Sequence, residues 1–166
     1  MRLAGMLTWA VFAQGTSLAT PPEAEAAHQA VRLNELESIA TKIERSDSNY
    51  DKRLLQDQMA MLALTEGELQ TCSTKCVHPF ARAWAVHVLG HLPSAQNQAL
   101  IILSLKDAAP IVREQGYEAV AQIGDRTHLK EIMQAANKEE KPHLQQLAQQ
   151  SSQQIVSKST NTDFPE

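Results

Sequence analysis

The chain has 166 residues, a length that favours one domain and is sufficient to bury a hydrophobic core without metals. Hydrophobic residues make up 43% and aromatic residues only 4%, a composition that excludes a disordered chain and favours helices over strands. The net charge is -4 and no basic stripe is present, which argues against nucleic acid as a partner.

The first 19 residues resemble a secretory signal peptide rather than part of the fold. Arg2 supplies the positive start, and Leu3–Ala13 is an uncharged apolar run. This run is too short to cross a bilayer core about 30 Å thick as a helix. Small residues near Ala19 predict cleavage there, and cleavage after Ala13 is the alternative. We therefore expect export to the bacterial periplasm or beyond, without a membrane span after cleavage.

Residues 20–70 are expected to form an N-terminal helical hairpin. Thr20 and Glu23 have capping-box spacing, and the first helix should run from Pro22 to about Arg45. A polar turn at 46–49 separates it from a second helix, expected over about Tyr50–Glu66. The first helix carries an apolar stripe at helical spacing: Leu33, Leu36, Ile39, Ala40 and Ile43.

The only two cysteines, Cys72 and Cys76, lie in a polar stretch that is expected to be a loop over residues 71–77. An isolated pair in an oxidising compartment favours a disulfide bond between them. The spacing is one residue too long for a redox Cys-x-x-Cys pair or for c-type haem attachment. We therefore interpret the cysteines as structural.

An internal repeat follows the cysteines. Pro79 and Pro110 are 31 residues apart, as are Arg82 and Arg113. A period of this length is typical of a helical solenoid, in which each helix pair is buried on its neighbours. Apolar or small positions coincide at the same offset in the first helices and at an offset of 30 in the second: Phe80/Ile111, Ala81/Val112, Ala85/Gly116, Val88/Ala119, Leu89/Val120, Leu92/Ile123, Ala99/Leu129, Ile102/Ile132 and Leu103/Met133.

The first repeated helix has an unusually wide apolar surface. One stripe contains Phe80, Trp84 and Val88, and another contains Ala81, Ala85 and Leu89. Such a helix must be covered on more than one side, as an inner helix of a stack is. The small residues at Ala81, Ala85 and Gly116 would allow neighbouring helices to approach closely.

The stretches His78–Gly90 and Lys106–Val120 resemble short HEAT-like repeats of the phycobilin-lyase type, which carry a proline at the helix start, an arginine soon after and a Leu-Gly near the end. The second unit departs from this pattern, with Ala121 in place of Gly90. The resemblance covers residues 77–138 and implies an all-α fold, a short α-α superhelix. In such repeats the arginine usually pairs with an acid or a helix end between units, and Asp107 is the candidate partner of Arg113.

The HEAT-like region is expected over residues 78–156, ending in a capping helix at about Pro142–Val156. Residues 157–166 are polar and are expected to form a disordered tail.

The repeat architecture, together with the absence of catalytic motifs, favours a protein-binding scaffold. The alternatives are a periplasmic inhibitor or immunity-type protein and an accessory subunit of an envelope complex. An enzyme is disfavoured, because no nucleophile elbow, phosphate-binding loop or His-Glu-x-x-His motif is present, and no cofactor is expected. Bilin attachment has no supporting residues and conflicts with export. The second helices of the units are expected to present the contact residues Gln98, Lys106, Lys130, Glu131 and Gln134.

His87 and His91 are four residues apart, a spacing that can place two imidazoles on one metal ion. A zinc site needs at least a third protein ligand, and the same helix offers no acidic residue. We therefore interpret the pair as surface histidines, and no metal site is predicted.

Overall fold

The computed structural model describes residues 22–161, and the statements below concern that part of the chain. The predicted signal peptide, the start of the predicted capping box and residues 162–166 lie outside it. The described chain is all-helical, as predicted, with one short 3-10 helix and no strand. The elements are α1 (Pro22–Arg45), α2 (Asn49–Met61), α3 (Glu66–Lys75), α4 (Pro79–Leu89), α5 (Ala95–Ser104), α6 (Pro110–Ile123), η1 (Arg126–His128), α7 (Leu129–Ala136) and α8 (Pro142–Asn161).

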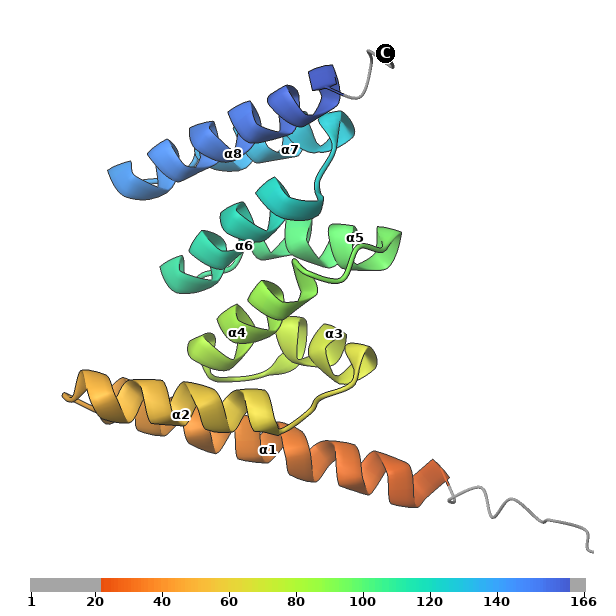
Figure 1. The fold of residues 1–166 in the computed structure, drawn as a ribbon, viewed down its shortest axis with the longest axis vertical. Helices are drawn as coiled ribbons and strands as arrows, with labels where there is room; N and C mark the ends of the chain where they lie inside the picture. Colours follow the sequence, from red (N-terminus) through yellow and green to blue (C-terminus); the bar gives the residue numbers. More distant parts are fainter. Residues whose placement is uncertain (1–21, 162–166) are drawn as a thin grey trace, which may run out of the picture.

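The helices follow one another in pairs along the longest axis of the molecule (Figure 1). The α1/α2 hairpin lies at one end, and α7 and α8 lie at the other. Between them α4 packs against both α3 and α6, and α6 packs in turn against α8. Pro79 and Pro110 begin α4 and α6, as predicted, because proline fits the first turn of a helix and cannot continue the helix before it.

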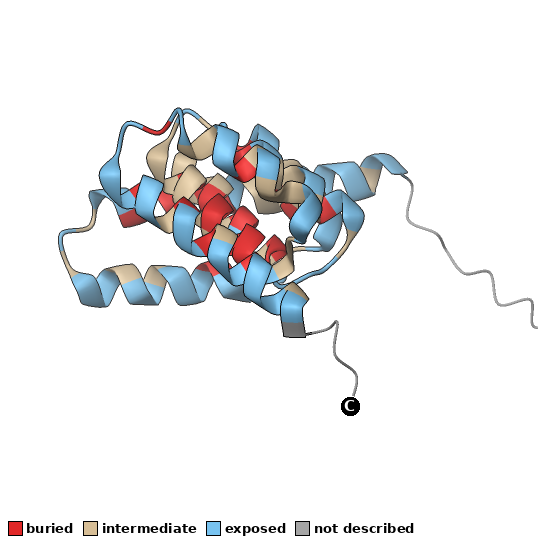
Figure 2. Ribbon diagram, turned by 90° about the horizontal axis from the view of Figure 1, so that it is seen from above, coloured by how far each residue is buried: buried red, intermediate tan, exposed pale blue. Residues whose placement is uncertain are grey.

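The core runs through the middle of this arrangement (Figure 2). Ala81, Ala85 and Leu89 of α4 are fully buried, which confirms one of the two stripes as core. Close helix approach depends on small residues at two points. A Cβ atom on Gly116 would collide with the Ser104 hydroxyl, and one on Gly90 would lie 2.8 Å from the Cβ of Ala119.

The predicted cysteine loop is wrong, because residues 66–75 form helix α3. A Thr65–Glu68 capping box starts this helix: the Glu68 carboxylate accepts from the Thr65 amide at 2.7 Å. The second helix therefore ends at Met61 rather than near Glu66, and the hairpin does not extend to residue 70. The predicted disulfide bond between Cys72 and Cys76 is present, with Cys76 ending the helix.

The last helix is longer than predicted, because α8 continues to Asn161 and residues 157–161 are helical rather than a disordered tail. One contact explains the extension: the Lys158 ammonium donates to the carbonyl oxygens of Ala121 and Gln122 at 2.7 and 2.9 Å. A lysine at the carbonyl end of α6 is favourable because those oxygens lack helical partners.

Replacing Gly116 by Ala should lower the free energy of unfolding by about 1–3 kcal/mol, because the added methyl group overpacks the contact between α5 and α6. Gly67→Ala is the matched control: it lies in the first turn of α3 with open space around it, so it should be neutral or stabilising by up to about 1 kcal/mol. Urea unfolding followed by circular dichroism measures both changes. Equal effects of the two substitutions would contradict the close approach.

Candidate functional site

Arg82 joins the start of α4 to the next layer of helices. Its Nη1 atom donates to the carbonyl oxygens of Cys76 and Val77 at 2.9 and 2.8 Å. Its Nε and Nη2 atoms donate to the two carboxylate oxygens of Asp107, each at 2.9 Å. This planar, bidentate geometry is specific to arginine.

Arg113 makes the same set of contacts one unit further on. It donates to the carbonyl oxygens of Asp107 and Ala108 at 2.9 and 3.0 Å and to both carboxylate oxygens of Glu139 at 2.7 and 2.8 Å. The expected Arg113–Asp107 carboxylate pair is therefore wrong. The Asp107 carboxylate instead binds Arg82 and its own chain at the Ala109 amide, because its turn directs it back toward the preceding layer.

The carboxylates that pair with arginines between the helices are stabilised in their charged form. The Arg113 guanidinium holds the pKa of Glu139 below its ordinary value of 4.5. Burial raises the pKa of Asp107, but the hydrogen bonds from Arg82 and the Ala109 amide outweigh it, so the pKa lies below 3.8. Burial likewise opposes ionisation of Glu68, yet its bonds from Thr65 and Arg32 lower the pKa below 4.5. These charged pairs join neighbouring helices.

The five predicted contact residues do not form one surface of similar exposure. Lys106, Lys130 and Gln134 are exposed, whereas Gln98 and Glu131 are half-buried. The Gln98 side chain donates to the carbonyl oxygen of Ile123 at 2.7 Å, so it ties α5 to the end of α6. That interaction gives Gln98 a structural role, and the partner-binding role of all five residues stays a prediction.

His87 and His91 meet edge to face, with ring centroids 5.1 Å apart. Within residues 22–161 no group of three or more His, Cys, Asp and Glu side chains is placed to hold a metal ion. The pair therefore brings together two imidazoles without the third ligand that a zinc site requires. His87 also lies on the wall of a cleft beside α4.

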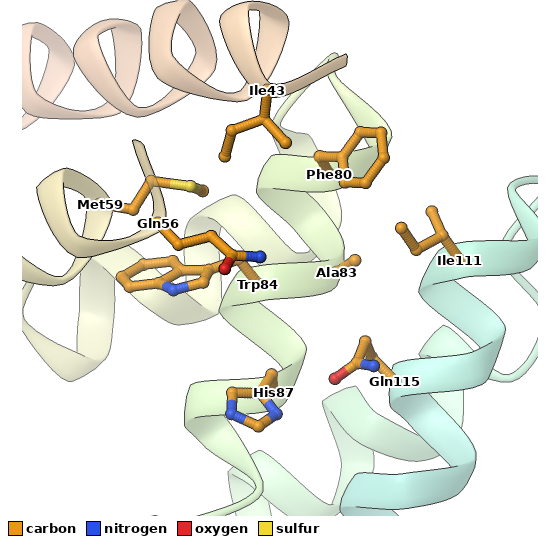
Figure 3. Close-up of a pocket in the computed structure, with 9 residues that line it drawn as sticks. All are labelled: Ile43, Gln56, Met59, Phe80, Ala83, Trp84, His87, Ile111 and Gln115. Carbon is orange, nitrogen blue, oxygen red and sulfur yellow. The ribbon is translucent and has the colours of Figure 1, made fainter. Parts of the chain in front are cut away.

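This cleft has a volume of about 410 Å³ and lies between the α1/α2 hairpin and the helices α4 and α6 (Figure 3). The α4 wall carries the aromatic rings of Phe80 and Trp84, both half-buried. The hairpin and α6 supply the facing side chains, and no lining residue comes from α3, α5 or α7. The complete lining is Ile43, Gln56, Met59, Phe80, Ala83, Trp84, His87, Ile111 and Gln115.

The chemistry of the cleft is apolar with a few polar groups and no carboxylate, lysine or arginine. The side chains of Gln56 and His87 make no hydrogen bond within the described part of the chain. Gln115 uses its amide nitrogen to bind Glu118 at 2.9 Å and keeps its carbonyl oxygen available. The cleft can therefore bury apolar groups and also donate and accept a small number of hydrogen bonds.

The cleft was not predicted, although a signal for it is present in the repeat. Phe80 and Trp84 lie 31 residues before Ile111 and Gln115, so equivalent positions of α4 and α6 face the same cleft. The Phe80/Trp84 stripe was interpreted as covered by neighbouring helices. At the position of α6 that is equivalent to Trp84, the repeat has the polar residue Gln115. This change indicates instead that the side of the helices facing the cleft is only partly covered.

Comparison with known protein families, with characterised proteins and with solved structures finds no match to this chain. Within residues 22–161 no helix combines the length and apolarity needed to cross a membrane.

The free energy of unfolding should be steady near neutral pH and fall as the pH drops below about 4.5, because Glu139, Asp107 and Glu68 all have lowered pKa values in the folded state. A lowered folded pKa contributes stability that is complete above the unfolded pKa and is lost as the pH falls through the folded pKa. Urea unfolding at a series of pH values measures this loss.

Glu139→Gln provides the control for that profile. It removes the charge facing Arg113, so it should cost about 2 kcal/mol at neutral pH and make the loss in acid shallower. A variant whose stability falls in parallel with that of the unchanged protein would show that Glu139 contributes nothing to the acid sensitivity.

Proposed function

We propose that this chain is an exported, HEAT-like repeat module that holds a protein partner in the bacterial periplasm or envelope, and that the cleft beside α4 is its binding site. The observation that carries the proposal is the aromatic cleft at Phe80 and Trp84, which contains no carboxylate, lysine or arginine. Large aromatic side chains on a partly open surface are the residues that most often dominate binding between proteins.

The lining indicates what the partner presents. Because the cleft offers no carboxylate, lysine or arginine, a charged segment would lose its hydration without gaining a strong opposite charge. An apolar side chain would be buried against Phe80, Trp84 and Met59, while Gln56 and Gln115 can bind peptide N–H and C=O groups. We therefore favour an apolar, uncharged segment of a protein as the ligand. The volume of about 410 Å³ lies within the ordinary range for binding pockets.

Two observations support export. Residues 1–19 have the pattern of a signal peptide, and Cys72 and Cys76 are bonded to each other. A disulfide bond is compatible with an oxidising compartment and is rare in the cytosol.

A photo-crosslinking amino acid at position 115, in the cleft, should capture one defined partner in the living cell, whereas the same group at position 134 on α7 should not. Mass spectrometry of the crosslinked product identifies the partner and its bound segment. Trp84→Ser should abolish the product at position 115, because it removes the largest apolar wall of the cleft. Capture at position 134 alone would move the site to the surface predicted from sequence, and capture at neither would contradict a binding module.

The segment found in this way can be tested on Trp84 itself. Trp9 lies in the predicted signal peptide, so the cleaved, exported protein keeps Trp84 as its only tryptophan. Its emission should shift to shorter wavelength when an apolar segment excludes water from the cleft. Unchanged emission at saturating segment would contradict binding at this place.

Export predicts a difference in thiol labelling between two forms of the protein. With residues 1–19 present, the isolated protein should resist alkylation of Cys72 and Cys76 until it is reduced, because the pair is oxidised after export. A version lacking residues 2–19 and kept in the reducing cytosol should label readily. Free, reactive thiols in both forms would contradict export to an oxidising compartment.

A further inference from the structure

The α1/α2 hairpin has an outer face at the end of the molecule, which we call the end face. It comprises Val31, Glu35, Ser38 and Lys42 of α1 together with Leu54, Gln58 and Met61 of α2. All seven residues are exposed. A shallow hollow of about 350 Å³ lies between these two helices and shares part of its lining with the end face. Its lining residues are Glu35, Ser38, Ile39, Lys42, Gln58, Met61 and Leu62.

The end face points away from the rest of the molecule. On α1, polar contacts to the neighbouring layer come from Arg32, which pairs with Glu68, from Glu37, which accepts from the Val77 amide, and from Glu44, which lies 3.0 Å from the His78 ring. The α1 residues of the end face recur at spacings of four, three and four, which places them on one stripe. At 100° per residue the centre of this stripe lies about 140° around the helix from Glu37 and Glu44.

The two ends of the molecule expose different kinds of side chain to solvent. At the far end α8 exposes mainly glutamines, with Val156 exposed at 43%, and a polar outer face is what keeps the end of a helical array in solution. The end face instead exposes Met61 at 80%, Val31 at 63% and Leu54 at 49%. The exposed glutamines of α8 are Gln145, Gln146, Gln149, Gln150, Gln153 and Gln154.

The end face carries one acidic and one basic residue whose spacing is complementary to a second copy of α1. Glu35 and Lys42 lie at equal distances on either side of Ser38 and Ile39, about 10 Å apart along the helix. Neither makes an ion pair within the described part of the chain. When two copies of α1 cross antiparallel at Ser38, Glu35 of each copy meets Lys42 of the other. The same surface is then complementary to itself, as a two-fold interface requires.

We infer that the end face is a dimer interface with a second copy of this chain, in which the α1 helices pack antiparallel about a two-fold axis at Ser38. The small Ser38 side chain allows the helices to approach at the axis. Leu54 and Met61 flank it and leave water on association. Two helices of this length bury on the order of 1,000 Å² in total, at the lower limit for a specific interface, so the dimer should be weak and concentration-dependent.

The interface leaves the cleft accessible. Gln56 and Met59 line the cleft from a different side of α2 than Leu54 and Met61, which belong to the end face. A dimer therefore presents two clefts, which would strengthen binding to a partner that offers two segments. The dimer itself does not depend on the proposed function.

Sedimentation velocity over a concentration series of the protein isolated from the cell tests the inference. The unchanged protein should form dimers at the upper end of the series. Glu35→Lys and Lys42→Glu should each weaken dimerisation at least tenfold, because each places like charges in contact. Lys130→Glu, a charge reversal on the exposed surface of α7, should leave the dimer unchanged.

The two single variants also test the register of the helices. In Glu35→Lys both positions of the pair are basic, and in Lys42→Glu both are acidic. Mixed in equal amounts, the two variants should therefore form dimers again, because each basic position of one chain meets an acidic position of the other. The double variant Glu35→Lys/Lys42→Glu should dimerise on its own. A monomer at every concentration of the unchanged protein would overturn the dimer, and failure of the mixture to associate would overturn the antiparallel pairing.

The apolar part of the interface is tested separately. Met61→Gln should weaken the dimer severalfold, whereas Met133→Gln, an equivalent change of an exposed methionine on α7, should not. Circular dichroism of each variant establishes that its helices are intact. Equal effects of the two substitutions would contradict a role for the end face.

Discussion

The arrangement of this molecule depends on two arginines that each connect one layer of helices to the next. Arg82 binds the carbonyl oxygens that precede α4 and also Asp107 beyond α5, and Arg113 repeats this pattern with Glu139. Burying a guanidinium is costly unless its N–H donors are hydrogen-bonded. Each arginine therefore restricts the relative position of the two layers of helices that it joins. The helices that carry the arginines, α4 and α6, are therefore held in a defined relation, and the cleft lies on their other side.

One apolar stripe of α4 is buried in the core, and the other is partly exposed. Ala81, Ala85 and Leu89 are fully buried, and their small size permits close packing on α3 and α6. Phe80 and Trp84 lie on the adjacent stripe, where the neighbouring helices cover them only in part. The cleft exists because the α1/α2 hairpin and α6 meet α4 from two sides without closing over these rings (Figure 3).

Much of the helical order was predictable because it depends on local signals. Prolines at the starts of α4 and α6, helical spacing of apolar residues in α1 and the turn at 46–49 all act within a few residues. Helix α3 was missed although Thr65 and Glu68 form a capping box, because the polar stretch around the cysteines was interpreted as a loop. The end of α8 was missed for a different reason: Lys158 reaches carbonyls of α6, a contact between residues more than 30 positions apart.

The sequence by itself determined that the chain is helical, where most helices begin, and that Cys72 bonds to Cys76, because propensity, caps and short spacings act locally. Only the tertiary structure decided that Asp107 pairs with Arg82 rather than with Arg113, since two acids compete for two arginines and the layer spacing selects between them. It also decided that Trp84 lies at a cleft, because whether a residue on an apolar stripe is covered depends on helices distant in sequence.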